Sequence, residues 1–490
     1  KPVQSLSLDP IKENKIYDDT FSIVGKIYDT HGVEKVDVKI KNAKTNAVVH
    51  TYASVTNITA TSEPTENNLL QEITVGSEGA IKTDGSYIVE VTTTDKVGKV
   101  TENEYSIMVD REAPTVEISS IGDGDVISVL TKIEGAASDA ASGVDTSSGR
   151  YVIKYNADEV INAELTMQQN GTWIANVLEN TLQAEGPYEI SVTIKDKVNH
   201  SATAKRTVIY DKAVPQLKVT SPNGNSLVTK TNIQLGGKAW DSYGLKESGS
   251  VQIVVKDSTG AVKRTYTPAV TVATSEPESD NWNQTIKLAA SGTAGQAGYE
   301  SALTDGNYTI EVQAVDKVGK ESSLQIFEVL IDRVKPSLSD LEVNLKAEEY
   351  GNDGTNTVYN ITQIPIILKA SDTSSGIQTV EYSTLNSIEN NYKDSFRSLR
   401  MNKDGKWTET VTCDWEGTKA ITVRAIDKAG NEHTDTINVC IDTTAPNAEK
   451  ITSDKGESIL VDGEADVSVT IYAADDENST YNSGIATVKI

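Results

Sequence analysis

Aspartates occur at matching positions in successive segments of this chain, and groups of carboxylates can serve as ligands for a divalent cation. The first group consists of Asp110, Asp139 and Asp196. The corresponding groups farther along the chain are Asp211, Asp241 and Asp316, then Asp332, Asp372 and Asp427, and finally Asp442, Asp475 and Asp476. Because Ca²⁺ prefers oxygen ligands and above all carboxylates, each group suits a calcium ion if the fold brings its members together.

The same aspartates also have a metal-free explanation. An Asp at the start of a loop forms an Asx turn with its own backbone. Cations follow most of these aspartates, namely Lys96, Lys197, Lys317 and Lys428 after one set, and Arg111, Lys212 and Arg333 after another. We favour turns and salt bridges and keep calcium as the alternative. Thr443 replaces the cation in the last group, so Asp442 with Asp475 and Asp476 is the strongest calcium candidate.

Other chemistry finds little support in the sequence. The histidines His31, His50, His200 and His433 are scattered and form no zinc-binding pair, and no Gly-x-Ser-x-Gly elbow occurs. We therefore expect no catalytic activity and no required cofactor. A formal charge of -26 argues against nucleic acid as a partner. The short apolar runs predict no membrane insertion in this segment.

The aspartates lie in a segment that occurs four times, at 95–114, 196–215, 316–336 and 427–446. Each copy reads Asp-Lys, a small turn, a β-rich run, then Asp and Pro. The closing prolines are 101, 121 and 110 residues apart, which is the length of a whole domain. We predict domains at 1–112, 113–213, 214–334 and 335–444. Residues 445–490 read as the first half of a fifth domain in a chain that continues, or one whose missing strands a partner supplies.

A strand with strict alternation precedes each Asp-Lys pair. In the second repeat Tyr188, Ile190, Val192 and Ile194 form one apolar face. The Tyr follows a Gly turn at the start of the penultimate strand, where an immunoglobulin-type sandwich has its tyrosine corner. Tyr87 and Tyr308 are equivalent, whereas the fourth repeat has Lys419. The predicted fold is all-β, with tandem immunoglobulin-like β-sandwich domains arranged as an elongated array.

The stretches "AIDKAGN…VCIDTTAP" and "DGNYTIEVQAVDKVGK…VLIDRVKP" resemble the tandem bacterial Ig-like (Big-type) repeats of large cell-surface proteins. The resemblance implies an extracellular location on a bacterial surface and a structural or adhesive role, as a semi-rigid stalk or spacer. The alternatives are a subunit of a self-assembling surface layer or filament, and an accessory module of a polysaccharide-acting enzyme. Expected partners are other domains of the same chain, further copies of it, or a surface glycan or protein ligand.

The sandwich model also places the aspartates. The loops after the second and the penultimate strand lie at one pole, where the linker from the preceding domain enters, so the model predicts that each group of aspartates meets at a joint. Repeats 1 and 3 share the insertions "ATSEPTEN" and "ATSEPESD", and repeats 2 and 4 share "SDxxSG" and a Gly-x-Trp turn. This pattern indicates an A-B-A-B array.

Cys413 and Cys440 are the only cysteines of the sequence. They could form a disulfide in an extracellular protein. We favour the alternative that Cys440 fills the apolar strand position that Met108, Ile209 and Leu330 occupy in the other repeats.

Overall fold

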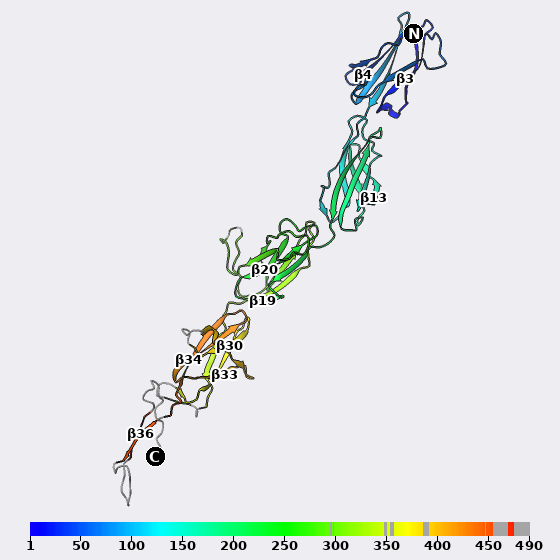
Figure 1. Cartoon of the computed structure of the whole chain (residues 1–490). Coiled ribbons are helices and arrows are strands. Elements are labelled where there is room, and N and C mark those ends of the chain that lie inside the picture. The colour runs from blue at the N-terminus through cyan, green and yellow to red at the C-terminus, as the bar shows by residue number, and fades with distance from the viewer. Residues whose placement is uncertain are drawn as a thin grey trace, which may run out of the picture. The chain divides into compact units, whose positions relative to one another are not determined.

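The computed structural model consists almost entirely of β-strands and describes residues 1–294, 296, 298–346, 350–352, 357–385, 392–445, 447–453 and 469–474 (Figure 1). The chain divides into two compact units, Lys1–Val214 with Lys317–Lys320, and Pro215–Asp316 with Glu321–Ile490. Among the described residues, no helix is long and apolar enough to cross a membrane.

Sandwich 1 opens the first unit and packs two sheets around one core. A three-stranded sheet has the order β1 (Val3–Asp9), β3 (Phe21–Tyr28) and β6 (Leu69–Ile73). A five-stranded sheet has the order β2 (Ile16–Tyr17), β8 (Val100–Val109), β7 (Gly85–Asp95), β4 (Val33–Asn42) and β5 (Val48–Thr51). The short 3-10 helix η1 (Glu13–Lys15) leads into β2.

Sandwich 2 completes the first unit and has one strand more. Its four-stranded sheet has the order β14 (Thr166–Met167), β15 (Thr172–Asn176), β11 (Lys132–Ser138) and β9 (Thr115–Ile118). Its five-stranded sheet has the order β10 (Val126–Ile127), β17 (Ser201–Tyr210), β16 (Gly186–Lys195), β12 (Arg150–Tyr155) and β13 (Asp158–Glu164).

Sandwich 3, in the second unit, has the same strand arrangement as sandwich 1. Its three-stranded sheet has the order β18 (Gln216–Ser221), β20 (Ile233–Trp240) and β23 (Trp282–Ile286). Its five-stranded sheet has the order β19 (Ser226–Thr229), β25 (Gln325–Ile331), β24 (Gly306–Ala314), β21 (Val251–Asp257) and β22 (Val262–Tyr266).

Sandwich 4 resembles sandwich 2. Its four-stranded sheet has the order β26 (Ser337–Val343), β29 (Gln363–Ser371), β33 (Trp407–Thr412) and β32 (Arg400–Met401). Its six-stranded sheet has the order β27 (Tyr350–Asn352), β28 (Thr357–Tyr359), β35 (Glu432–Ile441), β34 (Gly417–Asp427), β30 (Ile377–Ser383) and β31 (Arg397–Ser398). The 3-10 helix η3 (Tyr392–Asp394) precedes β31.

Beyond sandwich 4, β36 (Asn447–Ser453) and β37 (Val469–Ala474) pair antiparallel where the sequence predicts the start of a fifth domain. The domain limits given above stay predictions, because the described strands define each sandwich without fixing where its linkers end.

The alternation read from the sequence produces the cores. In β16 the side chains of Tyr188, Ile190, Val192 and Ile194 are buried, and they pack with residues of the opposite sheet such as Trp173. Trp173 lies over Gly135, where an added Cβ would come within 2.3 Å of the indole ring. The tight fit explains why a glycine stands opposite this tryptophan.

Each sandwich also contains a short strand that pairs parallel with its last strand. The pairs are β2 with β8, β10 with β17, β19 with β25, and β28 with β35. In this register Cys440 pairs with Val358, and Met108, Ile209 and Leu330 hold the same place in the other sandwiches. The favoured interpretation of Cys440 is thus confirmed.

The alternative disulfide is not formed. Both cysteines are buried free thiols. They belong to opposite sheets, since Cys413 follows β33 and Cys440 lies in β35. Burial raises the pKa of the Cys413 thiol to about 12, which keeps it protonated and unreactive near neutral pH.

The A-B-A-B pattern has a structural counterpart. Sandwiches 2 and 4 add the short strands β14 and β32 next to β15 and β33. Sandwiches 1 and 3 have their insertions at the corresponding point of the sequence, before β6 and β23. Each insertion is anchored by one Asn: Asn68 bonds both backbone groups of Ile27, and Asn281 bonds both of Ala239. The side-chain amide thus continues the pairing of β6 with β3, and of β23 with β20, beyond the last backbone pair.

The predicted tyrosine corners are present in three sandwiches. The hydroxyls of Tyr87, Tyr188 and Tyr308 donate to the carbonyls of Thr83, Ala184 and Thr304, at 2.8, 2.9 and 3.1 Å. In sandwich 4 the residue four before Lys419 is Trp415, and the Lys419 ammonium lies 5.5 Å from its ring centroid. A cation–π contact therefore stands where the other sandwiches have a hydrogen bond.

We predict that Tyr188→Phe lowers the free energy of unfolding of sandwich 2 by about 1 kcal/mol, because it removes one hydroxyl hydrogen bond without changing the buried ring. Tyr210→Phe is the matched control, since the structure shows no hydrogen bond from that hydroxyl. Hydrogen exchange of the β16 amides in the full chain measures the effect. Equal protection in both variants would mean that the corner adds nothing to stability.

Candidate functional site at the joints between sandwiches

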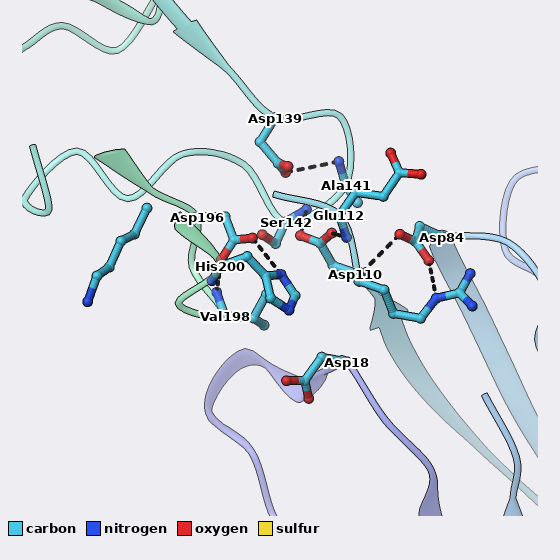
Figure 2. A network of polar contacts seen from close by, with 12 residues as sticks. Asp18, Asp84, Asp110, Glu112, Asp139, Ala141, Ser142, Asp196, Val198 and His200 are labelled. Atoms are coloured by element: carbon cyan, nitrogen blue, oxygen red, sulfur yellow. Dashed lines mark hydrogen bonds and ion pairs between the residues drawn. The ribbon is translucent and has the colours of Figure 1, made fainter. Parts of the chain in front are cut away.

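The linker aspartate of the first joint, between sandwiches 1 and 2, is bonded on both sides. Asp110 follows β8 directly, and its N–H donates to the carbonyl of Tyr17 in β2 at 2.9 Å. Its carboxylate is fully buried, and Oδ2 accepts the N–H of Ser142 in sandwich 2 at 3.0 Å (Figure 2). One residue thus connects the last strand of one sandwich to a loop of the next.

The two loop aspartates of sandwich 2 close their own loops. Oδ1 of Asp139 accepts the N–H groups of Ala141 and Gly143 at 3.1 and 2.7 Å. Oδ1 of Asp196 accepts those of Val198 and His200 at 2.8 and 2.9 Å (Figure 2). The predicted Asx turns are confirmed, and each leaves the second carboxylate oxygen outside the turn.

The third joint, between sandwiches 3 and 4 in the second unit, repeats this arrangement. The N–H of Asp332 donates to Thr229 in β19 at 2.9 Å, and its Oδ2 accepts the N–H of Ser375 at 3.1 Å. Asp372 closes its loop by accepting the N–H of Gly376 at 2.7 Å. Asp332 is fully buried.

An asparagine completes the third joint. Oδ1 of Asp427 accepts the N–H of Asn431 and Oδ2 accepts its side-chain amide, both at 2.8 Å. The same amide donates to the carbonyl of Asp332 at 3.1 Å. Asn431 therefore joins the penultimate-strand loop of sandwich 4 to the linker from sandwich 3.

The structure brings together the three predicted aspartates of the third joint. Asp332, Asp372 and Asp427 each offer an oxygen within 4.8 Å of the other two. At the first joint the corresponding group is Asp110, Asp196 and His200. Asp139 is not in that group. It lines an adjacent cavity of about 410 Å³ with Asp84, Asp110 and Glu112.

His200 is a residue of the joint that the sequence analysis missed. Its Nδ1 lies 2.9 Å from Oδ2 of Asp196, the residue four positions earlier (Figure 2). The sequence did contain a signal for this residue. The position four after the loop Asp varies among the repeats, whereas the rest of the motif repeats, and the residues at that position are Lys99, His200, Lys320 and Asn431. The hydrogen bond from Lys12 is the main cause that lowers the pKa of Asp18, and His200 makes a minor electrostatic contribution across the joint.

The other two predicted groups are described in part. Asp211 follows β17 and is buried in the first unit, whereas Asp241 and Asp316 are buried in the second unit and offer oxygens within 4.8 Å of each other. Asp442 follows β35 and is nearly buried, and its Oδ1 accepts the N–H of Thr444 at 3.2 Å. Asp475 and Asp476 lie outside the described residues, and so does the site that they were predicted to form.

The favoured salt-bridge interpretation is wrong at the first and third joints. Arg111 turns back to Asp84 of its own sandwich, with Nε 2.7 Å from Oδ1, and Arg333 does the same with Asp305 at 2.7 Å. Lys197 and Lys428 lie over the loop glycines Gly143 and Gly376. Within the described residues, no Lys or Arg pairs with Asp110, Asp139, Asp332, Asp372 or Asp427. The reason for the two arginines is geometric, because acids of their own sandwiches hold Arg111 and Arg333.

Among the described residues, the third joint therefore gathers three carboxylates with which no Lys or Arg pairs, although the Lys230 ammonium bonds the nearby carbonyl of Gly430. At the first joint His200 contacts Asp196. Like charges at such separations repel by about 3–4 kcal/mol per pair at an effective dielectric constant of roughly 20. The donor set of the third joint consists of carboxylate oxygens with backbone and amide groups around them, which fits a hard cation such as Ca²⁺. At the first joint the imidazole of His200 adds a nitrogen, which calcium does not favour.

The sheet orders, the parallel short strands and the tyrosine corners define tandem immunoglobulin-like β-sandwich repeats. No family model and no curated protein sequence matches the chain. Among solved structures, a tetra-tandem repeat from the extending region of a large adhesion protein is 17% identical, with TM-score 0.32, over 90% of this chain and 100% of that one.

Two further solved structures are similar over most of this chain. A Ca²⁺-stabilized adhesin with which an Antarctic bacterium binds ice is 15% identical, with TM-score 0.27, over 89% of this chain and 99% of that one. The human desmocollin-1 ectodomain is 12% identical, with TM-score 0.24, over 89% and 79%. At these values the fold assignment depends on the sheets and corners of this chain itself.

We predict that Asn431→Ala loosens the third joint, because it leaves Oδ2 of Asp427 and the carbonyl of Asp332 without their amide donor, at a cost of about 1–3 kcal/mol. The measurement is hydrogen exchange at the Ser375 N–H, which should become faster. Asn402→Ala is the control, since Asn402 closes a turn of sandwich 4 through the N–H groups of Asp404 and Lys406. Unchanged exchange at Ser375 in Asn431→Ala would contradict the role of Asn431.

Proposed function

We propose that this chain is a non-catalytic segment of a large bacterial extracellular protein and that its sandwiches form a semi-rigid stalk or spacer. The observation that carries the proposal is the buried linker aspartate. Asp110 and Asp332 are each held by their own sandwich through the backbone and by the next sandwich through the carboxylate. A flexible tether would leave this residue in solvent.

The linkers give further support because few of their torsions are free. Three residues separate Asp110 from Pro114, and the same holds for Asp332 and Pro336. The first of the three is bonded back to the preceding sandwich, and the proline fixes its own φ. At the third joint the carbonyl of Pro336 also contacts Nδ1 of His433 at 2.9 Å. Short, anchored linkers of this kind restrict bending between domains.

We also propose that Ca²⁺ binds at the third joint and stiffens it further. Neither the first nor the third joint requires an ion in order to form. The proposal is supported by the three converging carboxylates, by the burial of Asp332 and Asp427, and by the lack of a Lys or Arg ion pair to any of the three among the described residues. The Asx turns hold the ligands in place before an ion arrives, which lowers the entropy lost on binding.

The stalk proposal predicts that the full chain behaves in solution as single particles with a narrow distribution of shapes. Asp332→Ala should broaden that distribution, because it cuts the carboxylate contact to Ser375. Small-angle scattering combined with negative-stain images measures both. Ordered sheets or filaments of the purified chain would favour the surface-layer alternative, and freely bending wild-type particles would exclude a semi-rigid stalk.

The calcium proposal predicts saturable binding of Ca²⁺ to the full chain by calorimetry, weakened at least tenfold in Asp372→Asn, which removes one charge but can keep the turn. Asp257→Asn is the matched control, because Asp257 closes a comparable turn by accepting the N–H groups of Thr259 and Ala261 away from the joint. Binding that is absent from the wild type, or equal in Asp372→Asn, would refute a calcium site at the third joint.

A further inference from the structure

The acidic residue before the glycine turn of each penultimate strand binds the residue that follows the linker aspartate. Four pairs show this contact: Asp84 with Arg111, Glu185 with Lys212, Asp305 with Arg333, and Glu416 with Thr443. The turn acid and the linker residue are 27 or 28 positions apart in the sequence, so the contact closes the end of the sandwich from which the chain leaves.

The contact is most developed in sandwiches 1 and 3. Arg111 donates from its backbone N–H to Oδ2 of Asp84 at 2.9 Å and from Nε to Oδ1 at 2.7 Å. Its Nη2 donates to the carbonyl of Lys82 at 3.0 Å. Arg333 repeats the side-chain part, with Nε 2.7 Å from Asp305 and Nη2 2.8 Å from the carbonyl of Leu303. The guanidinium is therefore held in one orientation by both a carboxylate and a carbonyl.

Sandwiches 2 and 4 use simpler forms of the contact. Glu185 accepts the backbone N–H of Lys212 at 3.1 Å. Glu416 accepts both the N–H and the hydroxyl of Thr443. The arginine version precedes the first and third joints, in which the linker carboxylate bonds a Ser N–H of the next sandwich.

The position of Asp84 gives the contact a second consequence. Asp84 lines the same cavity as Asp110, Glu112 and Asp139, so the carboxylate that holds the Arg111 guanidinium faces the same space as the joint carboxylates. Figure 2 shows Asp84 on one side of Asp110 and Asp139 on the other. An arginine released from Asp84 would find these carboxylates as its nearest partners.

We propose that Asp84 and Asp305 are positioning residues for the joints. Each fixes the direction in which the chain leaves its sandwich, and each withholds the linker arginine from the aspartates of the joint. The inference deepens the proposed stalk function, on which it rests. It explains why the cations that follow the linker aspartates do not neutralise them.

The test measures the spread of distances across the first joint in the full chain. Spin labels on Lys44→Cys and Asp158→Cys report from exposed sites of sandwiches 1 and 2, and the buried native thiols of Cys413 and Cys440 stay unlabelled. Pulsed electron paramagnetic resonance then gives the width of the distance distribution. Asp84→Ala should widen it roughly twofold or more, because the exit segment loses both its backbone and its side-chain anchor.

Further variants separate the parts of the contact. Arg111→Ala keeps the backbone bond to Asp84 and should widen the distribution less than Asp84→Ala does. Glu185→Ala is the matched control, because it alters the exit of sandwich 2 and should leave the first joint unchanged. A label pair within sandwich 1, on Lys44→Cys and Val97→Cys, checks that the sandwich stays folded.

The outcomes are distinct. A wild-type distribution that is already broad would refute the semi-rigid stalk itself. A narrow wild type with an unchanged Asp84→Ala would refute the positioning role and leave the stalk standing. Widening in Asp84→Ala together with an altered intra-sandwich distance would show a merely structural role and would also overturn the inference.

Discussion

The burial of one carboxylate directly after the last strand is the constraint on which the joints depend. The short parallel strand of each sandwich accepts the backbone N–H of this linker aspartate, at 2.9 Å for Asp110, Asp211 and Asp332 and 3.0 Å for Asp442. The register of the last strand thus decides where the carboxylate points. A one-residue slip would turn it to the other face and remove it from the joint.

The alternation of the sandwiches follows from how each type completes its smaller sheet. Sandwiches 1 and 3 lack the fourth strand and carry an insertion instead, directly after which Asn68 or Asn281 extends the pairing of β6 with β3 or of β23 with β20. The insertion also bonds the Asp that opens the first loop, since the N–H of Asp29 donates to the carbonyl of Ala60 and that of Asp241 to the carbonyl of Ala273, both at 3.2 Å. In sandwiches 2 and 4 the first loop instead has one residue more between its Asp and its Gly, and the N–H of Ser142 or Ser375 in this turn bonds the incoming carboxylate.

The sequence predicted the repeating parts of this structure and missed the pairing within them. Alternation in Tyr188–Ile194 identified the penultimate strand, and a Tyr after a Gly turn identified the corner, because both depend on residues close in sequence. The convergence of Asp332, Asp372 and Asp427 was also predicted, because an immunoglobulin-type sandwich places the two loops and the incoming linker at one pole. The partner of Arg111 was not predicted, because a cation next to an aspartate in the sequence need not bind that aspartate in space. Asp84 precedes the first strand of the β7–β8 hairpin and Arg111 follows the second, so the two are far apart in the sequence although they meet at the open end of the hairpin. His200 was missed because it breaks the repeat that revealed the other residues.

The geometry also separates the stability of each sandwich from the stiffness of its joints. The cores consist of apolar residues of both sheets, such as Ile190 and Trp173, and none of the joint carboxylates contributes to them. Each loop aspartate uses one oxygen to close its own turn, which folds with the sandwich. The second oxygen faces the joint, where that of Asp196 contacts His200 and that of Asp427 accepts the Asn431 amide. Charge repulsion between these outer oxygens therefore opposes closure of the joint and leaves the sandwich core untouched. A cation that relieves this repulsion should act on the angle between neighbouring sandwiches more strongly than on their unfolding, because the loops that bind it are already ordered by backbone hydrogen bonds.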